Sequence, residues 1–132
     1  QRLFMGEEDV GVWAVDARAD QPATLTSVIK VGTQLQADVE GLALYQSAGR
    51  DYLVVSGQGN DSYLVLDAEP PFASHGAFRV GLNAAAGIDG ASETDGLEVT
   101  SANLGGPWSQ GLLVVQDGHN HSRSRTATTT CR

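Results

Sequence analysis

The sequence predicts an all-β fold, and three observations carry that prediction. Short runs rich in Val, Leu and Tyr recur along the chain, as expected for half-buried strands. Sixteen glycines and four prolines, with many Asp, Asn and Ser residues, separate these runs at turn-like positions. No segment has the apolar period of an amphipathic helix of useful length. With 132 residues, the chain has room for one domain.

The apolar runs predict nine strands, which are listed here in chain order: residues 2–5, 10–16, 25–31, 41–47, 52–57, 62–67, 77–82, 97–101 and 111–116. Gly49 lies in a short turn that joins two of these runs as a hairpin, and residues 59–61 form the next turn. Residues 41–67 should therefore form a meander of three antiparallel strands.

A weak internal repeat suggests that this meander belongs to a propeller blade. An acidic residue, Gly and Leu begin a unit at residues 40–42 and again at 95–97, and Gly41 and Gly96 are 55 positions apart. That spacing is close to the ~50 residues of kelch-type blades. Residues 3–8 occupy the equivalent strand end of the preceding repeat. We expect a partial β-propeller with a little over two repeats, since a closed ring needs at least four blades. A small β-sandwich is the alternative.

The charge balance restricts the partners. Sixteen acidic residues stand against eight Lys and Arg, giving a formal charge of −8. Nucleic-acid binding normally needs a basic face, so we expect no nucleic-acid partner. An anionic substrate would need a cation between itself and the protein. No run approaches the ~18 apolar residues of a membrane helix, so no membrane partner is expected. The single cysteine, Cys131, has no disulfide partner.

Carboxylates recur where the predicted strands stop, and they are the candidate ligands of a metal ion. Equivalent strand ends converge on one face of a propeller, so acids far apart in sequence can meet there. Calcium takes six to eight oxygen ligands and would relieve the repulsion between the carboxylates. Asp38 and Glu40 are two positions apart, which places both on one side of a strand. The competing interpretation is that each acid serves only solubility or local capping. The acids concerned are Glu7, Glu8, Asp9, Asp38, Glu40, Asp89, Glu93, Asp95 and Asp117.

Other kinds of active site have little support in the sequence. His75, His119 and His121 do not have the spacing of a zinc site, and the order of residues in a Ser-His-Asp triad is absent. No glycine-rich phosphate loop is present. Nucleophilic catalysis by a side chain is therefore not expected.

Five motifs together resemble the β-propeller phytases, in the order and close to the spacing of that family. They span residues 1 to about 120 and are EEDVGVW (7–13), ADVEGL (37–42), SGQGNDSY (56–63), IDGASETDGL (88–97) and VQDGHN (115–120). The resemblance implies a six-bladed propeller of four-stranded antiparallel meanders. Residues 1–120 would supply roughly two to three of its blades. Residues 121–132 depart from the family pattern, and we expect them to be disordered.

The resemblance also implies a set of ligands and a reaction. Calcium would be the cofactor, held by side chains that include the candidate catalytic residues Asp38, Glu40, Asp89 and Asp95. Glu7 is the alternative to Glu8 if the first loop is shifted by one residue. The reaction would be that of a 3-phytase: hydrolysis of phosphate monoesters on phytate by metal-activated water. The implied metal ligands are Glu8, Asp38, Glu40, Gln58, Asp89 and Asp95, with Asp117 and Asn120 at a structural calcium site.

Two other functions remain open at this point. One is a calcium-binding propeller module without hydrolytic activity, and the other is a structural β domain with solvated acids. The family's phosphate-binding Lys and Arg residues would lie upstream of this chain, so its binding of calcium phytate would be incomplete. By resemblance, we expect a secreted protein whose full-length parent is monomeric. The isolated chain would expose strand edges and tend to self-associate.

Overall fold

The computed structural model of the chain describes residues 1–118 and 127–130. Across these residues the secondary structure consists of strands and 3₁₀ turns, without an α-helix. No helix among them is long and apolar enough to cross a membrane. The strands are β1 (Arg2–Glu7), β2 (Gly11–Asp16), β3 (Thr26–Lys30), β4 (Val39–Ser47), β5 (Arg50–Gly57), β6 (Ser62–Asp67), β7 (Ser74–Phe78), β8 (Leu97–Thr100), β9 (Leu112–Val115) and β10 (Ala127–Thr130); the 3₁₀ turns are η1 (Gln58–Asn60), η2 (Ala84–Ala86) and η3 (Gly106–Trp108).

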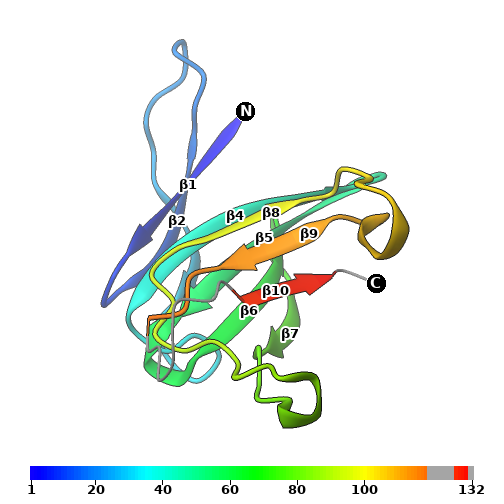
Figure 1. Cartoon of the computed structure of the whole chain (residues 1–132). Coiled ribbons are helices and arrows are strands. Elements are labelled where there is room, and N and C mark those ends of the chain that lie inside the picture. The colour runs from blue at the N-terminus through cyan, green and yellow to red at the C-terminus, as the bar shows by residue number, and fades with distance from the viewer. Residues whose placement is uncertain (119–126, 131–132) are drawn as a thin grey trace.

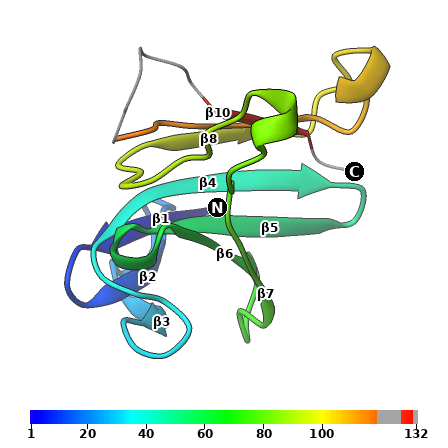
Figure 2. The same cartoon turned by 60° about the horizontal axis from the view of Figure 1, so that its bottom comes forward.

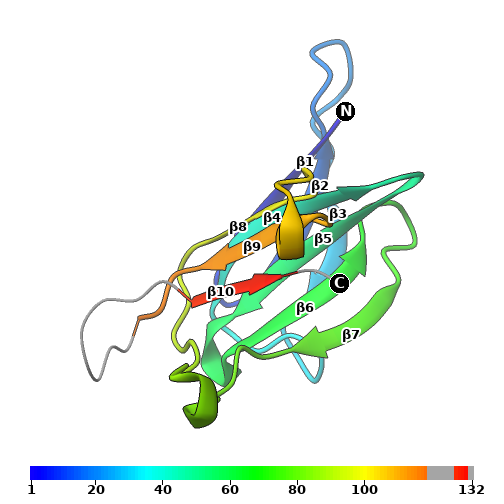
Figure 3. The same ribbon diagram turned by 45° about the vertical axis from the view of Figure 1, so that its right-hand side comes forward.

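The strands form three antiparallel sheets, which confirms the all-β prediction (Figure 1). The first sheet has the order β1-β2-β3, the middle sheet β4-β5-β6-β7, and the third β8-β9-β10. The middle sheet is the four-stranded meander of a complete blade, and Figure 3 shows its strands in that order. Gly49 adopts a φ of 84° in the tight turn between β4 and β5, a conformation that favours glycine.

The three sheets pack face to face, so the middle sheet is buried on both sides (Figure 2). Strand β5 shows this alternation most clearly, because successive side chains of a strand point to opposite faces. Leu53 and Val55 join an apolar cluster that includes Val12 of the first sheet. Val54 joins a second cluster that includes Val99 and Leu113 of the third sheet. This stacking of successive sheets is that of adjacent propeller blades, and it differs from the two-layer sandwich considered as an alternative.

A glycine allows the middle and third sheets to approach closely. A Cβ atom at Gly41 would lie 2.9 Å from the backbone nitrogen of Leu97, so a side chain there would force β4 and β8 apart. These two strands lie side by side in Figures 1 and 2. Gly41 and Leu97 belong to the repeated acidic-Gly-Leu motif, so the repeat corresponds to the first strands of two consecutive blades.

The predicted strand over residues 77–82 differs most from the structure. Strand β7 spans Ser74–Phe78 instead. Residues 80–82 follow this strand and do not pair with β6. The reason is that the carbonyl of Val80 accepts a hydrogen bond from the backbone N–H of Ala91, while the Val80 side chain packs on the second apolar cluster. The apolar residues Val80 and Leu82 therefore belong to the crossing between two blades.

The segment expected to be disordered contains a strand. Ala127–Thr130 form β10, which pairs antiparallel with β9 in the register Ala127 to Val115 and Thr130 to Leu112. A run of three threonines has the branched side chains that favour strands, and β9 offers an open edge beside it. The expectation of disorder therefore does not hold for these four residues. The remainder of 121–132 lies outside the described residues.

Candidate metal site

Three carboxylates from two sheets meet at one end of the blades. Glu8 follows β1, Asp38 precedes β4, and Glu40 lies within β4. One ligand oxygen from each side chain lies within 4.8 Å of the other two. Glu8 is exposed, while Asp38 and Glu40 are half-buried. The strand ends predicted to converge therefore do so for these three residues.

Backbone contacts fix the relative positions of the three carboxylates. The N–H of Val39 donates to the carbonyl of Glu8 at 2.9 Å, which ties the start of β4 to the loop after β1. The N–H of Gln58 donates to the carbonyl of Asp38, also at 2.9 Å, which ties the turn after β5 to the same segment. A Cβ atom at Gly59 would lie 1.9 Å from the carbonyl oxygen of Ala37. Only glycine therefore allows this turn to close on the segment that carries Asp38.

The carboxylates raise one another's pKa. Partial burial raises the pKa of Glu40 above its usual range, and the nearby carboxylates of Glu8, Asp95 and Asp38 raise it further. Burial also raises the pKa of Asp38, with additional contributions from Asp9 and Glu8. None of the ion pairs formed by the described residues includes Glu8, Asp38 or Glu40. Within the described part of the chain, the group thus combines concentrated negative charge with no compensating side-chain cation.

The structure distinguishes Glu8 from its neighbours in the acidic loop. The indole N–H of Trp13 donates to Glu7 Oε2 at 2.7 Å, which directs the Glu7 carboxylate to the β2 side of the hairpin. Glu8, and not Glu7, belongs to the three-carboxylate group. Asp9, a candidate acid from its strand-end position but not one of the ligands that the resemblance implies, also faces Asp38.

Asp95 and Gln58 extend the acidic group toward the third sheet. The Gln58 amide donates from Nε2 to Asp95 Oδ1 at 2.7 Å, so two of the candidate ligands are hydrogen-bonded to each other across two blades. Asp95 immediately precedes Gly96 and β8, the first strand of its blade. Its charge contributes to the raised pKa of Glu40, which places it electrostatically within the same site.

Asp89 and Asp117 lie together in a second acidic location. Both line a hollow of about 270 Å³ that also contains Asp61 and Arg79. Asp117 accepts a hydrogen bond from the N–H of Ser92 at 3.1 Å. Asp89 is not part of the Glu8, Asp38 and Glu40 group in the described residues. Asp61 was not predicted, and Asn120 lies outside the described residues.

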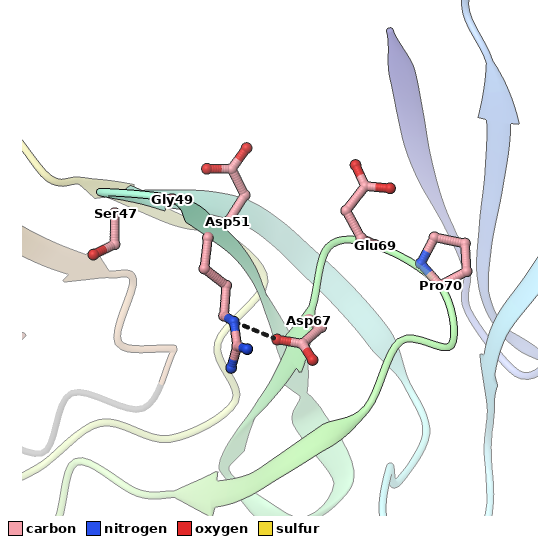
Figure 4. Close-up of a pocket in the computed structure, with 7 residues that line it drawn as sticks. Ser47, Gly49, Asp51, Asp67, Glu69 and Pro70 are labelled. Atoms are coloured by element: carbon pink, nitrogen blue, oxygen red, sulfur yellow. Dashed lines mark ion pairs between the residues drawn. The ribbon is translucent and has the colours of Figure 1, made fainter.

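The far end of the same blades carries a different charge pattern (Figure 4). There, a hollow of about 470 Å³ is lined by Arg50 and by the carboxylates of Asp51, Asp67 and Glu69. Asp67 lies 2.8 Å from His75 Nε2 and 3.9 Å from Arg50 Nε. Glu69 pairs with Arg2 at 2.7 Å. Two of the three acids that line this hollow therefore have a cationic or ionisable partner.

The chemistry of the donors at the first site fits calcium. All the groups offered are oxygens of carboxylates or an amide, which hard cations prefer over nitrogen or sulfur ligands. Ligands from separate loops suit the flexible geometry of calcium better than the strict octahedron of magnesium. Glu8, Asp38 and Glu40 would hold the ion, with Asp95 and Gln58 beside them. The site therefore has the composition of a site for a hard divalent cation.

Comparison with known proteins places the chain in a family. The profile of the phytase family matches residues 1–130. The chain is 34% identical over 120 residues to a 3-phytase of Bacillus subtilis (strain 168). That alignment covers 89% of this chain but 31% of the relative, so the chain spans about a third of the relative's length.

Proposed function

The chain belongs to the phytase family, and from this premise we propose that it is part of a calcium-dependent phosphomonoester hydrolase acting on phytate. The observation that carries the proposal is the group of Glu8, Asp38 and Glu40, which gathers three carboxylates that have no cationic partner among the residues the structure describes. An acidic protein that acts on a highly anionic substrate requires such a place for a divalent ion.

The positions of Glu8, Asp38, Glu40, Gln58 and Asp95 support their proposed roles, whereas those of Asp89, Asp117 and Asn120 rest on the family resemblance. Glu8, Asp38 and Glu40 hold calcium, and Asp95 completes the site from the third sheet with Gln58 fixing its orientation. Asp38, Glu40, Asp89 and Asp95 are the proposed catalytic residues. Bound calcium supplies neutralisation of the phosphoryl charge and activation of the attacking water. Asp89, Asp117 and Asn120 are proposed to hold calcium as well.

A calcium titration of wild type and Asp38→Asn tests the metal site. Isothermal calorimetry should show calcium binding by the wild-type chain and a loss of affinity of at least tenfold in the variant, since even the partners of metal ligands affect affinity by this much. Asp51→Asn is the matched control, because it removes the same charge at the far end of the β4–β5 hairpin. Equal calcium affinity in all three proteins would refute the proposed site.

A phosphate-release assay separates hydrolysis from binding alone. The chain and its full-length parent are incubated with calcium phytate, and free phosphate is measured. We expect release by the parent that depends on Asp38 and Glu40. Calcium binding without release by either protein would favour the non-catalytic binding module. Secretion and a monomeric parent are further proposals that rest on the family alone.

A further inference from the structure

A small polar network lies inside the otherwise apolar interface between the middle and third sheets. Thr94 is 2% exposed and Tyr63 is 1% exposed, and Tyr63 belongs to the apolar cluster that includes Val54, Val99 and Leu113. Tyr63 Oη and Thr94 Oγ1 are 2.6 Å apart. A buried polar pair needs complete hydrogen bonding to be tolerated in such a place.

The direction of these hydrogen bonds can be assigned. The Thr94 hydroxyl donates to the carbonyl of Gln116 at 2.8 Å, which uses its one proton. Tyr63 must therefore donate to Thr94. Burial raises the pKa of the Tyr63 phenol above its usual value, so this group keeps its proton at neutral pH. Each hydroxyl in the pair then has a defined role.

The same network holds the backbone on both sides of the Thr94–Asp95 peptide bond. Ser56, which is buried, donates from its hydroxyl to the carbonyl of Thr94 at 2.8 Å. The N–H of Asp95 donates to Gln116 Oε1 at 2.8 Å, and the Gln116 N–H donates to the carbonyl of Gly96. Because Gln58 holds the Asp95 carboxylate itself, both the backbone and the side chain of Asp95 are fixed.

We propose that Tyr63 and Thr94 are positioning residues that set the Asp95 carboxylate at the metal site. This inference rests on the proposed function, since it assigns Asp95 to the calcium ligands. Neither hydroxyl touches the site: Tyr63 acts through Thr94, and Thr94 acts through Gln116 and the backbone. The network links strands of two blades, so the position of Asp95 depends on how the middle and third sheets are packed together.

The test compares Tyr63→Phe with Tyr45→Phe in the full 132-residue chain. Tyr45 also donates one hydrogen bond between the two sheets, to the carbonyl of Gln110 at 2.7 Å, but it is half-buried and its hydrogen bond lies outside the Thr94 network. Calcium affinity is measured by calorimetry and stability by melting in chelator. Tyr63→Phe should weaken calcium binding about tenfold, the lower end of effects seen for the partners of metal ligands. Tyr45→Phe should leave the affinity unchanged.

Thr94 provides the second arm of the test. Thr94→Val removes the hydroxyl at similar volume and should weaken calcium binding like Tyr63→Phe, whereas Thr94→Ser keeps the hydroxyl and should restore most of the affinity. Hydrogen exchange of the Asp95 amide, measured by NMR without calcium, should be faster in Tyr63→Phe and Thr94→Val only.

The outcomes separate this inference from the proposed function. Unchanged calcium affinity and unchanged Asp95 exchange in both Tyr63→Phe and Thr94→Val would overturn the positioning role. Faster exchange of the Asp95 amide in a protein that binds no calcium would support the positioning of Asp95 and overturn the proposed metal site. Equal effects of Tyr63→Phe and Tyr45→Phe on affinity would show general loosening of the blades, which would also overturn the inference.

Discussion

The two ends of the blades carry acidic residues in opposite electrostatic states. At the far end, Asp16 accepts hydrogen bonds from the guanidinium of Arg18, which lowers its pKa to about 2. At the site end, Asp38 and Glu40 face other carboxylates, and both pKa values are raised. Strands β1 and β2 connect these ends, because Asp16 ends β2 and Glu8 follows β1.

This contrast shows that carboxylates have different effects on stability at the two ends. The acids of the far end include several that pair with Arg or His, as is common for solvated surface charges. Those of the site end repel one another, which is unfavourable for the folded protein unless a cation is bound. The site end is therefore where a divalent ion would most change stability.

The largest expected effect comes from a glycine at the site end. Gly59→Ala would place a methyl group against the Ala37 carbonyl, so we expect a loss of about 3 kcal/mol in unfolding free energy, typical of severe overpacking. Urea denaturation measures it. Gly49→Ala at the far end is the control: its Cβ meets open space, and only the positive φ opposes it, at about 1 kcal/mol. Similar losses in both variants would show that the close approach at Gly59 is unimportant.

Glu40→Gln should separate metal affinity from stability. We expect calcium affinity to fall by roughly a hundredfold, or about 2.7 kcal/mol, the upper end of effects seen at metal sites. In chelator, however, the variant should melt no lower than wild type because it removes repulsion with Glu8. Calorimetry and thermal melts measure the two quantities. The control, Glu69→Gln, loses the ion pair with Arg2 at the far end and should keep its calcium affinity. A clear drop in the Glu40→Gln melting temperature in chelator would contradict the repulsion.

The two ends should also respond to pH with opposite signs. Because the pKa values of Asp38 and Glu40 are raised on folding, the folded protein binds more protons there, and stability in chelator should rise as pH falls from 7 toward the ordinary carboxyl pKa of roughly 4. Asp16 stabilises above its ordinary pKa of 3.8, and this contribution is lost as pH falls through about 2. Melting temperatures between pH 7 and 5 test the first effect. In an Asp38→Asn, Glu40→Gln double variant, the melting temperature should no longer rise between pH 7 and 5. If it rises as much as in wild type, other groups cause the pH dependence.

The smallest effect is expected from an ion pair at the far end. Arg50→Ala removes the guanidinium that lies 3.9 Å from Asp67, and Arg50 is largely exposed. We expect a loss below about 1 kcal/mol in urea denaturation, the usual range for exposed pairs, with calcium affinity unchanged. A change in calcium affinity in this variant would show that the two ends are coupled.

Much of the fold could be predicted because strand periodicity and turn residues are local properties. The strands around Gly49 were predicted nearly in place, since a glycine turn separates two apolar runs. Strand β7 was misplaced because Ser74 and Gly76 carry little apolar signal and pair only through their backbone with β6. Strand β10 was missed because its pairing depends on the distant edge of β9.

The candidate site was predicted in part, for a related reason. The convergence of Glu8, Asp38 and Glu40 follows from their places at strand ends. Asp61 was missed because a turn residue can face either side, and only the folded chain shows which. The separate location of Asp89 with Asp117 depends on the path of residues 79–92, which has no periodic pattern to predict it.

The alternating burial of β5 has a consequence for how this protein can vary. Since Leu53 and Val55 fill one interface and Val54 the other, neighbouring positions in one strand report on different neighbours of the middle blade. Substitutions at odd-numbered and even-numbered positions can therefore loosen one boundary of the blade while sparing the other. Substitutions in this one strand can therefore change the packing of the middle blade against each neighbouring blade separately.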